Sequence, residues 1–335
     1  MSEAFLRLTL NEQAEILNTL APELGRNAGV LEKDVWVCLV LQHLFQMPDR
    51  LQMAFKGGTS LSKAFDAINR FSEDVDVTLD YRGLDNSIDP FDPGISRTRA
   101  GKFSESLKDF VKQHVHDMVV PHLQARLQAN VEGARVEACD DGEEVRVFYP
   151  SALDRAGDYL RESVLIEFGG RNITEPNEEH QLRPYIAERL PDLELPSATV
   201  TVLAPERTFW EKATLIHAEC HRPDPKAKAD RLSRHWYDLA RLSDHDIGNN
   251  AIGNRALLAE VVKHKEVFFR YSFSNYSACL NGALRLVPDE PLLKALEVDL
   301  RAMIDGGMFY GDAPTFGAII DRLRALETTI NSGLV

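Results

Sequence analysis

The residues with the clearest chemical potential lie between Lys56 and Asp80, in the sequence KGGTSLSKAFDAINRFSEDVDVTLD. Asp74 and Asp76 belong to a segment, 74–80, in which polar and apolar residues alternate, and this pattern predicts a strand. Side chains at i and i+2 of a strand point to the same face, so the two carboxylates should lie side by side. Neighbouring carboxylates repel each other unless a cation lies between them, and such oxygen ligands suit Mg²⁺ (or Mn²⁺). The pattern predicts a metal site at Asp74 and Asp76.

A pair of glycines precedes this segment. Gly57 and Gly58 end a short apolar run over 52–56, which predicts a strand followed by a tight turn. Because glycine has no Cβ, the backbone N–H groups of such a turn can approach a phosphate closely. A helix expected over 60–69, N-capped by Thr59 or Ser60, would add the partial positive charge of its N-terminus. We interpret this segment as the part that binds the phosphates of an NTP, through Lys56, Gly57, Gly58, Thr59 and Ser60.

This order of Gly-Gly turn, helix and Asp-x-Asp strand resembles the signature of the nucleotidyltransferase superfamily. A longer part of the sequence is similar to the AbiEii/AbiGii-type nucleotidyltransferase toxins of bacterial toxin–antitoxin and phage-defence systems. The similar segments follow the family's order and are VLEKDVWV at 30–37, FKGGTSLSKAF and RFSEDVDV, APERTFWEKATLIHAE at 204–219 and RHWYDLARL at 234–242. The resemblance implies Mg-dependent transfer of NMP from an NTP, with release of pyrophosphate. It also implies a tRNA 3′ end as the typical acceptor and an antitoxin encoded nearby.

The resemblance carries three further residues into the catalytic set. Lys212, on a helix expected over 205–220, would neutralise charge on the transferred phosphate or on the leaving pyrophosphate. Asp238 lies among packing residues, and a buried acid needs a partner, for which Lys212, Arg234 or an active-site group are the options. Ser72, two positions before Asp74, matches the family's serine but is equally well explained as a loop hydroxyl.

Glu167 is an acid flanked by Ile166 and Phe168 in the expected strand 163–168. Many nucleotidyltransferases carry a third carboxylate on a later strand, which serves as a metal ligand or deprotonates the acceptor hydroxyl. Glu167 fits that place. The alternative is ordinary strand alternation, with the Glu167 side chain facing solvent.

The charge of the chain limits the kind of acceptor. The 335 residues carry a net charge of −14, which argues against coating duplex nucleic acid, because such binding depends on phosphate neutralisation. One local basic run, HRPDPKAKADRLSRH at 221–235, lies between Lys212 and Asp238. We expect Lys226, Lys228 and Arg231 to contact the acceptor backbone, and a solvated connector is the alternative reading. A protein hydroxyl as acceptor (AMPylation) and an inactive nucleotide- or partner-binding module also remain open.

The elements that must position these residues indicate an α+β fold. Strands are expected before about residue 204, including a hairpin over 134–149, and helices dominate after it. We expect a nucleotidyltransferase-fold mixed sheet with flanking helices in a domain over 1–204, with N-terminal helices. A mainly helical region over 205–335 should contribute to the active site. Four separated cysteines, no secretory signal and no apolar run of the roughly 20 residues that span a bilayer suit a cytoplasmic protein without membrane contact.

Overall fold

The computed structural model describes residues 4–153, 163–223 and 231–333. Its α-carbon contacts divide the chain into two compact units. Unit 1 consists of Met1–Ala64, Phe71–Asp89 and Lys102–Leu203, and unit 2 of Phe65–Arg70, Pro90–Gly101 and Ala204–Val335. The short segment Phe65–Arg70 therefore belongs with the C-terminal helices, although it lies between the Gly-Gly turn and the Asp-x-Asp strand in sequence.

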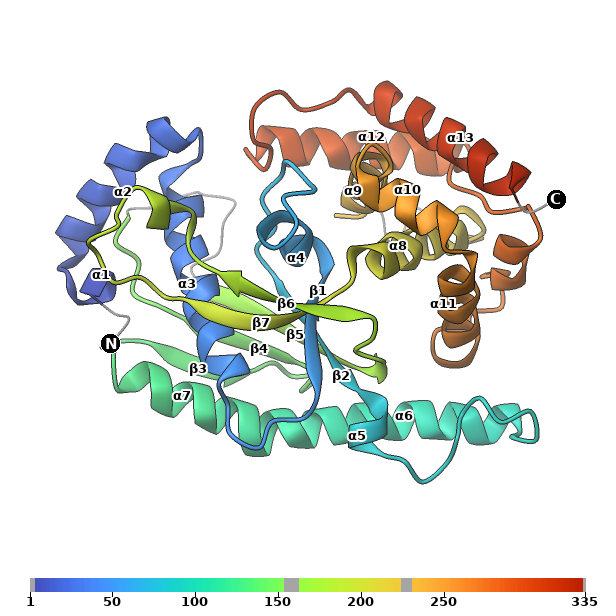
Figure 1. Cartoon of the computed structure of the whole chain (residues 1–335), viewed down its shortest axis with the longest axis horizontal. Coiled ribbons are helices and arrows are strands. Elements are labelled where there is room, and N and C mark those ends of the chain that lie inside the picture. The colour runs from blue at the N-terminus through green and yellow to red at the C-terminus, as the bar shows by residue number, and fades with distance from the viewer. Residues whose placement is uncertain (1–3, 154–162, 224–230, 334–335) are drawn as a thin grey trace. The chain divides into compact units, whose positions relative to one another are not determined.

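Unit 1 contains a mixed sheet of seven strands (Figure 1). The strand order is β3-β4-β5-β2-β1-β7-β6, with β2 parallel to β5, β1 parallel to β7, and the other neighbours antiparallel. The strands are β1 (Met53–Lys56), β2 (Val75–Asp80), β3 (Arg135–Ala138), β4 (Glu144–Phe148), β5 (Ser163–Asn172), β6 (Asn177–Leu182) and β7 (Ala198–Leu203). The expected mixed sheet with flanking helices is confirmed. The sequence did not predict β6, because its residues NEEHQL carry no apolar alternation.

Helices cover this sheet. The helix α3 (Ala28–Phe45) packs against β5 and β7 and is buried on almost every side. It follows α1 (Ala4–Arg7) and α2 (Leu10–Leu24), whose first turn is closed by a capping box between Thr9 and Glu12. Figure 1 shows α6 (Arg97–His114) and α7 (Val120–Gln128) as one nearly continuous helix. A π-helical turn over Val115–Val119 precedes Pro121 and accommodates this proline without ending the helix.

Two local predictions next to the glycines were wrong. The helix expected over 60–69 is α4 (Gly57–Lys63), which begins directly at the first glycine. Its N-cap position is Lys56, without a side-chain cap, so neither Thr59 nor Ser60 caps it. Their hydroxyls have other partners: the Thr59 side chain donates to the backbone oxygen of Asp74 (2.5 Å) and the Ser60 side chain to that of Gly57 (3.0 Å). Directly after β2 the chain forms a single helical turn, α5 (Tyr81–Leu84).

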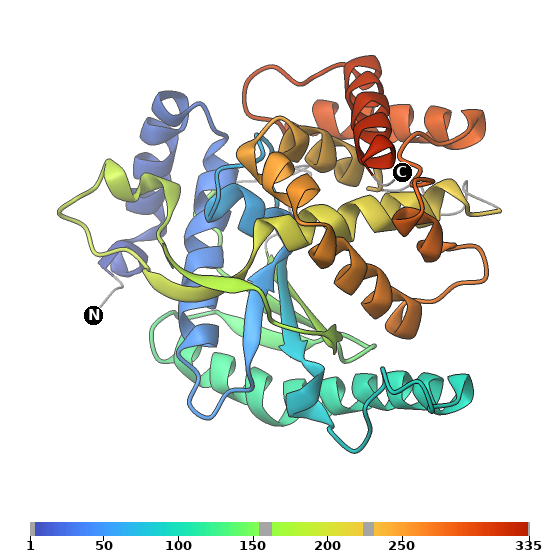
Figure 2. The same cartoon turned by 45° about the vertical axis from the view of Figure 1, so that its right-hand side comes forward.

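Unit 2 is helical, as expected for the C-terminal region. Figure 2 shows α8 in yellow beside the orange helices, and α8 contacts α9, α10 and α11. The helices are α8 (Pro205–Cys220), α9 (Ser233–Ser243), α10 (Asp246–Gly253), α11 (Arg255–Phe268), α12 (Glu290–Asp305) and α13 (Phe316–Ser332). Trp236, Leu239 and Leu242 are fully buried, so α9 packs through the face that the sequence indicated. No helix in the described ranges combines the length and hydropathy needed to cross a bilayer.

Candidate active site

The Gly-Gly turn and the Asp-x-Asp strand meet in unit 1. Gly57 has φ +79°, in the left-handed region that favours glycine, and a Cβ placed on it would overlap the carboxylate of Asp76. The strand register pairs Lys56 with Asp76, and Thr59 donates a hydrogen bond to the backbone of Asp74. The backbone of the turn is therefore held against the acidic strand, and this close approach requires glycine at position 57.

Asp76 lies in β2, and Asp74 is the residue directly before this strand, which begins one position later than expected. Asp74 and Asp76 are half-buried, whereas Val75 and Val77 between and after them are fully buried. The burial pattern agrees with strand alternation that begins at Asp74, and the joint role of the two carboxylates stays a prediction. Ser72 is also half-buried and lies in the loop before the strand.

The strand β5 places a third carboxylate beside the two aspartates. The register pairs Asp76 with Glu167 in the parallel neighbour, and Glu167 in turn with Glu144 on β4. Paired residues of adjacent strands project from the same face of a sheet, so Glu167 lies beside Asp76 and is half-buried. Lys56, Asp76, Glu167 and Glu144 thus follow one another across four strands.

The carboxylates of Asp74 and Asp76 suit a metal ion that is coordinated partly by the protein and partly by the substrate. Within residues 4–153, 163–223 and 231–333, no group of three or more His, Cys, Asp or Glu side chains is arranged to hold a metal ion. Asp74 and Asp76 therefore offer two carboxylates and no all-protein cage. Mg²⁺ is commonly bound in this way, through one or two carboxylates together with substrate phosphates and water. Since α4 has only seven residues, the close approach of Gly57 carries more weight here than a helix dipole.

Buried ion pairs from α3 hold the segments on both sides of this site. The Lys33 Nζ lies 2.5 Å from the Glu73 Oε2, directly before Asp74, and both side chains are buried. The carboxylate of Asp34 pairs with the ammonium of Lys63 at the end of α4, and both of these are buried as well. Breaking a buried pair by removal of one partner is strongly destabilising, so these pairs fix α4 and the start of β2 relative to α3.

A second cluster of charges lies in unit 2. Asp238 is fully buried, and its Oδ1 accepts from the Arg70 Nε (2.7 Å) while its Oδ2 accepts from the Arg70 Nη2 (2.8 Å). The Lys212 Nζ lies 2.9 Å from the same Oδ2 and 3.5 Å from the Nδ1 of His235. Asp238 therefore pairs with Lys212, one of its three expected partners, and with Arg70, which the sequence did not indicate. Two cations share one carboxylate, so these three groups carry a net positive charge.

The protonation of this cluster follows from its burial and its charges. Burial lowers the pKa of Lys212 and the cations Arg70 and Arg234 lower it further, whereas Asp238 opposes the shift. Burial alone would raise the pKa of Asp238, but the charges of Arg70 and Lys212 bring it well below its usual range. Burial and the neighbouring Lys212 also lower the pKa of His235 well below its ordinary value. Asp238 is thus an anion whose two oxygens are already paired with Arg70 and Lys212. This arrangement suits a role in positioning Lys212 better than a role in binding a metal.

Comparison with known proteins identifies the relatives of this chain. The family described as "Nucleotidyl transferase AbiEii toxin, Type IV TA system" matches residues 39–322. The chain belongs to this family. It is therefore a nucleotidyltransferase of a toxin–antitoxin system, with an NTP as substrate and an antitoxin as partner. The resemblance of its motifs to AbiEii toxins is confirmed.

Among solved structures, the nucleotidyltransferase toxin MenT4 from Mycobacterium tuberculosis H37Rv is similar, with 18% identity and a TM-score of 0.45. The similarity covers 95% of this chain and 98% of that chain. No curated protein matches the sequence.

The basic run of this AbiEii-family chain is only partly described. Lys226 and Lys228 fall in 224–230, outside the described residues. Arg231 is described, and its backbone N–H donates to the Oδ1 of Asp299 on α12 (2.7 Å). The acceptor-binding role of these three residues stays a prediction, as do the catalytic roles assigned above.

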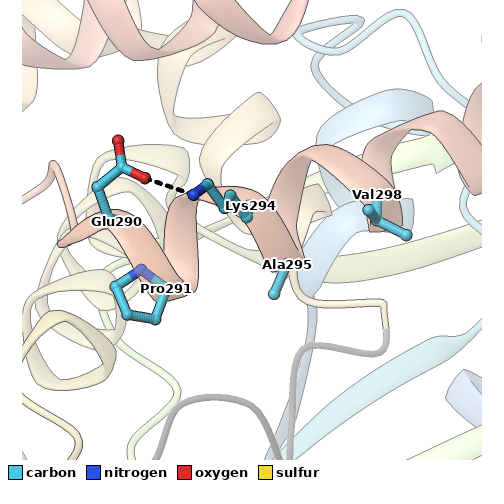
Figure 3. A pocket seen from close by; sticks show the side chains of 5 residues that line it. All are labelled: Glu290, Pro291, Lys294, Ala295 and Val298. Atoms are coloured by element: carbon cyan, nitrogen blue, oxygen red, sulfur yellow. Dashed lines mark ion pairs between the residues drawn. The ribbon is translucent and has the colours of Figure 1, made fainter.

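A hollow of about 600 Å³ lies beside α12 in unit 2, and its described lining carries no pair of carboxylates. The described residues that line it all lie on α12, and Figure 3 shows them along one side of that helix. They are Glu290, Pro291, Lys294, Ala295 and Val298. Its charged side chains, Lys294 and Glu290, are an exposed pair 3.0 Å apart. For this AbiEii-family protein, the carboxylates of Asp74, Asp76 and Glu167 beside the Gly-Gly turn are the better candidate for the active site.

Sequence reasoning missed Arg70 and Glu73, although both lie in the stretch that it singled out. Each is a buried charged residue, and its partner is distant in sequence, at Asp238 and Lys33 respectively. The only available signal was the rule that buried charges need partners, and this rule does not identify the partner.

Proposed function

We propose that this chain transfers a nucleoside monophosphate from an NTP to the 3′ end of an RNA, with tRNA as the favoured acceptor. Asp74 and Asp76 would hold Mg²⁺, and the turn at Gly57 and Gly58 would receive the NTP phosphates. The observation that carries this proposal is the close approach of Gly57 to the Asp76 carboxylate, which leaves no room for a Cβ. It brings backbone amides and a pair of acidic ligands to one point, which is what a metal–phosphate complex requires.

The reaction follows from these assignments. The oxygen of the acceptor hydroxyl forms a bond to the α-phosphorus, the bond from the α-phosphorus to the bridging oxygen breaks, and pyrophosphate leaves. Glu167, in register with Asp76, would take the proton of the attacking hydroxyl. Mg²⁺ when bound would neutralise phosphate charge and orient the phosphates. Lys212, the cation of the unit 2 cluster, would meet the negative charge that grows on the leaving group.

The choice of acceptor rests on two features of the chain. The family is one of toxins in toxin–antitoxin systems, for which a tRNA 3′ end is the acceptor that the sequence resemblance implied. The net charge of −14 favours a small RNA footprint, served by a local basic run, over extensive coating of nucleic acid. The antitoxin would be encoded beside this gene.

The test uses labelled NTPs, one base at a time, with total tRNA or total protein as acceptor. We expect label in RNA with Mg²⁺, none after chelation by EDTA, and recovery when Mg²⁺ is added back. Asp76→Asn, which keeps the side-chain shape, should lower the rate by about 1,000-fold or more. The matched control is Glu179→Gln, which removes an exposed carboxylate from the edge strand β6 and should change nothing.

Each result has a definite meaning. Wild-type activity of Asp76→Asn would overturn the metal assignment. Label in protein instead of RNA would replace the tRNA acceptor by a protein hydroxyl. No transfer with any base to either acceptor would favour an inactive nucleotide-binding module on this scaffold.

A further inference from the structure

Unit 2 presents a stacked pair of aromatic rings on the segment that follows α11. The rings of Tyr271 and Phe273 are nearly parallel, with an interplanar angle of 6° and centroids 5.3 Å apart. Phe273 is partly buried, but Tyr271 is 53% exposed. An exposed tyrosine backed by a second ring offers a flat aromatic surface to the solvent.

An arginine lies against this pair. The guanidinium carbon of Arg222 is 4.6 Å from the centroid of Phe273 and 5.9 Å from that of Tyr271. The Glu219 carboxylate holds this guanidinium through two hydrogen bonds of 2.6 Å each. Because the arginine is fixed and most of its side chain is buried, the three planar groups form a preformed stack, which we call the Tyr271 platform (Tyr271, Phe273 and Arg222).

The segment that carries the platform is tied to α8. The side chain of Ser274 donates to the backbone oxygen of Tyr271 (2.9 Å). His217 on α8 donates from its Nε2 to the backbone oxygen of Asn275 (3.0 Å) and accepts at its Nδ1 from the backbone N–H of Arg285 (2.9 Å). These two contacts assign the tautomer of His217. They also order the segment in advance, so less conformational entropy is lost when a ligand binds.

We propose that the Tyr271 platform stacks a base of the unpaired end of the acceptor RNA, an inference that rests on the proposed RNA acceptor. Aromatic faces and arginine planes bind unstacked bases with little sequence preference. The exposed Arg270 directly before Tyr271 offers a cation for the nucleic acid backbone. Lys212 lies eight residues, about 12 Å, before the end of α8 at Cys220, and Arg222 follows two positions after that end. The stacked base would therefore lie upstream of a reacting 3′ end near Lys212.

The test compares two fluorescein-labelled RNA hairpins, one with an unpaired 3′ tail and one blunt, by fluorescence anisotropy. Tyr271→Ala should weaken binding of the tailed hairpin by about 5- to 150-fold, the range for loss of one stacked base. It should leave the blunt hairpin unaffected and keep the salt dependence of binding, because no phosphate contact is removed. Tyr271→Phe should retain wild-type affinity. Val298→Ala, which truncates another exposed apolar side chain of unit 2, is the matched control and should change neither hairpin.

The outcomes separate this inference from the proposed function. If Tyr271→Ala binds the tailed hairpin like wild type while the wild-type protein still extends RNA, the platform is wrong and the proposed function stands. Equal weakening of both hairpins would also overturn base stacking. A wild-type protein that binds and extends no RNA but labels protein would overturn both. Because Tyr271 is exposed, the variant should keep the wild-type Tm, which confirms that any loss of binding is local.

Discussion

Asp238→Asn should shift the alkaline limb of the pH–activity profile to lower pH. The reasoning starts from Lys212, whose pKa is lowered by burial and by the cations Arg70 and Arg234, and raised by Asp238 alone. If the rate needs the protonated ammonium, activity is retained at pH values below the pKa of Lys212 and falls as the pH rises through it. Removing the one neighbour that stabilises the charge lowers this pKa further, so activity should disappear at a lower pH than in the wild type.

The size of the perturbation follows from the geometry. Two unit charges at the 2.9 Å separation of Lys212 and Asp238 attract each other by about 6 kcal/mol at an effective dielectric constant of about 20. Breaking a buried pair costs about 3–5 kcal/mol of folding free energy, against a total of about 5–15 kcal/mol for a domain. Asparagine keeps the side-chain shape, so we expect a folded but less stable variant. Urea unfolding measured beside the kinetics tells how much of it is folded.

The assay measures kcat from pH 6.5 to 10 with saturating NTP and acceptor. Arg70→Met provides a control of opposite sign, because it removes a cation that lowers the pKa of Lys212 and leaves the carboxylate of Asp238 in place. Its alkaline limb should move to higher pH. A wild-type alkaline limb in both folded variants would refute the idea that the rate depends on the charge of Lys212, and the cluster would then be structural only.

Three further predictions concern unit 1. Gly57→Ala should lower kcat by about 100-fold because the added methyl group displaces the neighbouring carboxylate, whereas Gly133→Ala, with a similar positive φ in open space, should cost only stability. Lys33→Met should lower the urea unfolding free energy by about 3–5 kcal/mol, and the Lys33→Met/Glu73→Leu double variant should recover most of it. Burial lowers the pKa of His43 to about 4, below its unfolded value, so stability is lost as the pH falls below about 6.5. Acidification from pH 7 to 5 should remove about 2 kcal/mol through this residue, and the calorimetric loss should be smaller in His43→Leu.

Much of the candidate site was predictable because its signals are local. Alternation over 74–80 is enough to predict β2 (Val75–Asp80) to within one residue and the half-buried positions of Asp74 and Asp76, because both follow from backbone geometry. The start of α4 was misplaced because the Ser and Thr hydroxyls after the glycines looked like capping groups. In the folded chain the Thr59 hydroxyl meets the backbone of Asp74 instead, a contact fifteen positions away that no local rule anticipates.

Ion pairs between residues far apart in the chain could not be predicted from the sequence. These pairs hold the segments of the candidate site in place. Lys33 and Asp34 are adjacent residues of a helix, so they point in different directions, and each finds a partner on a different segment: Glu73 before the acidic strand and Lys63 at the end of α4. These segments also meet through the hydrogen bond from Thr59. A shift of either segment would therefore leave a buried charge without its partner. The free-energy cost would be a large share of the total stability of the domain. The ion pairs with α3 thus hold the glycine turn close to the acidic strand. A metal–phosphate complex would bind to a site that is already formed.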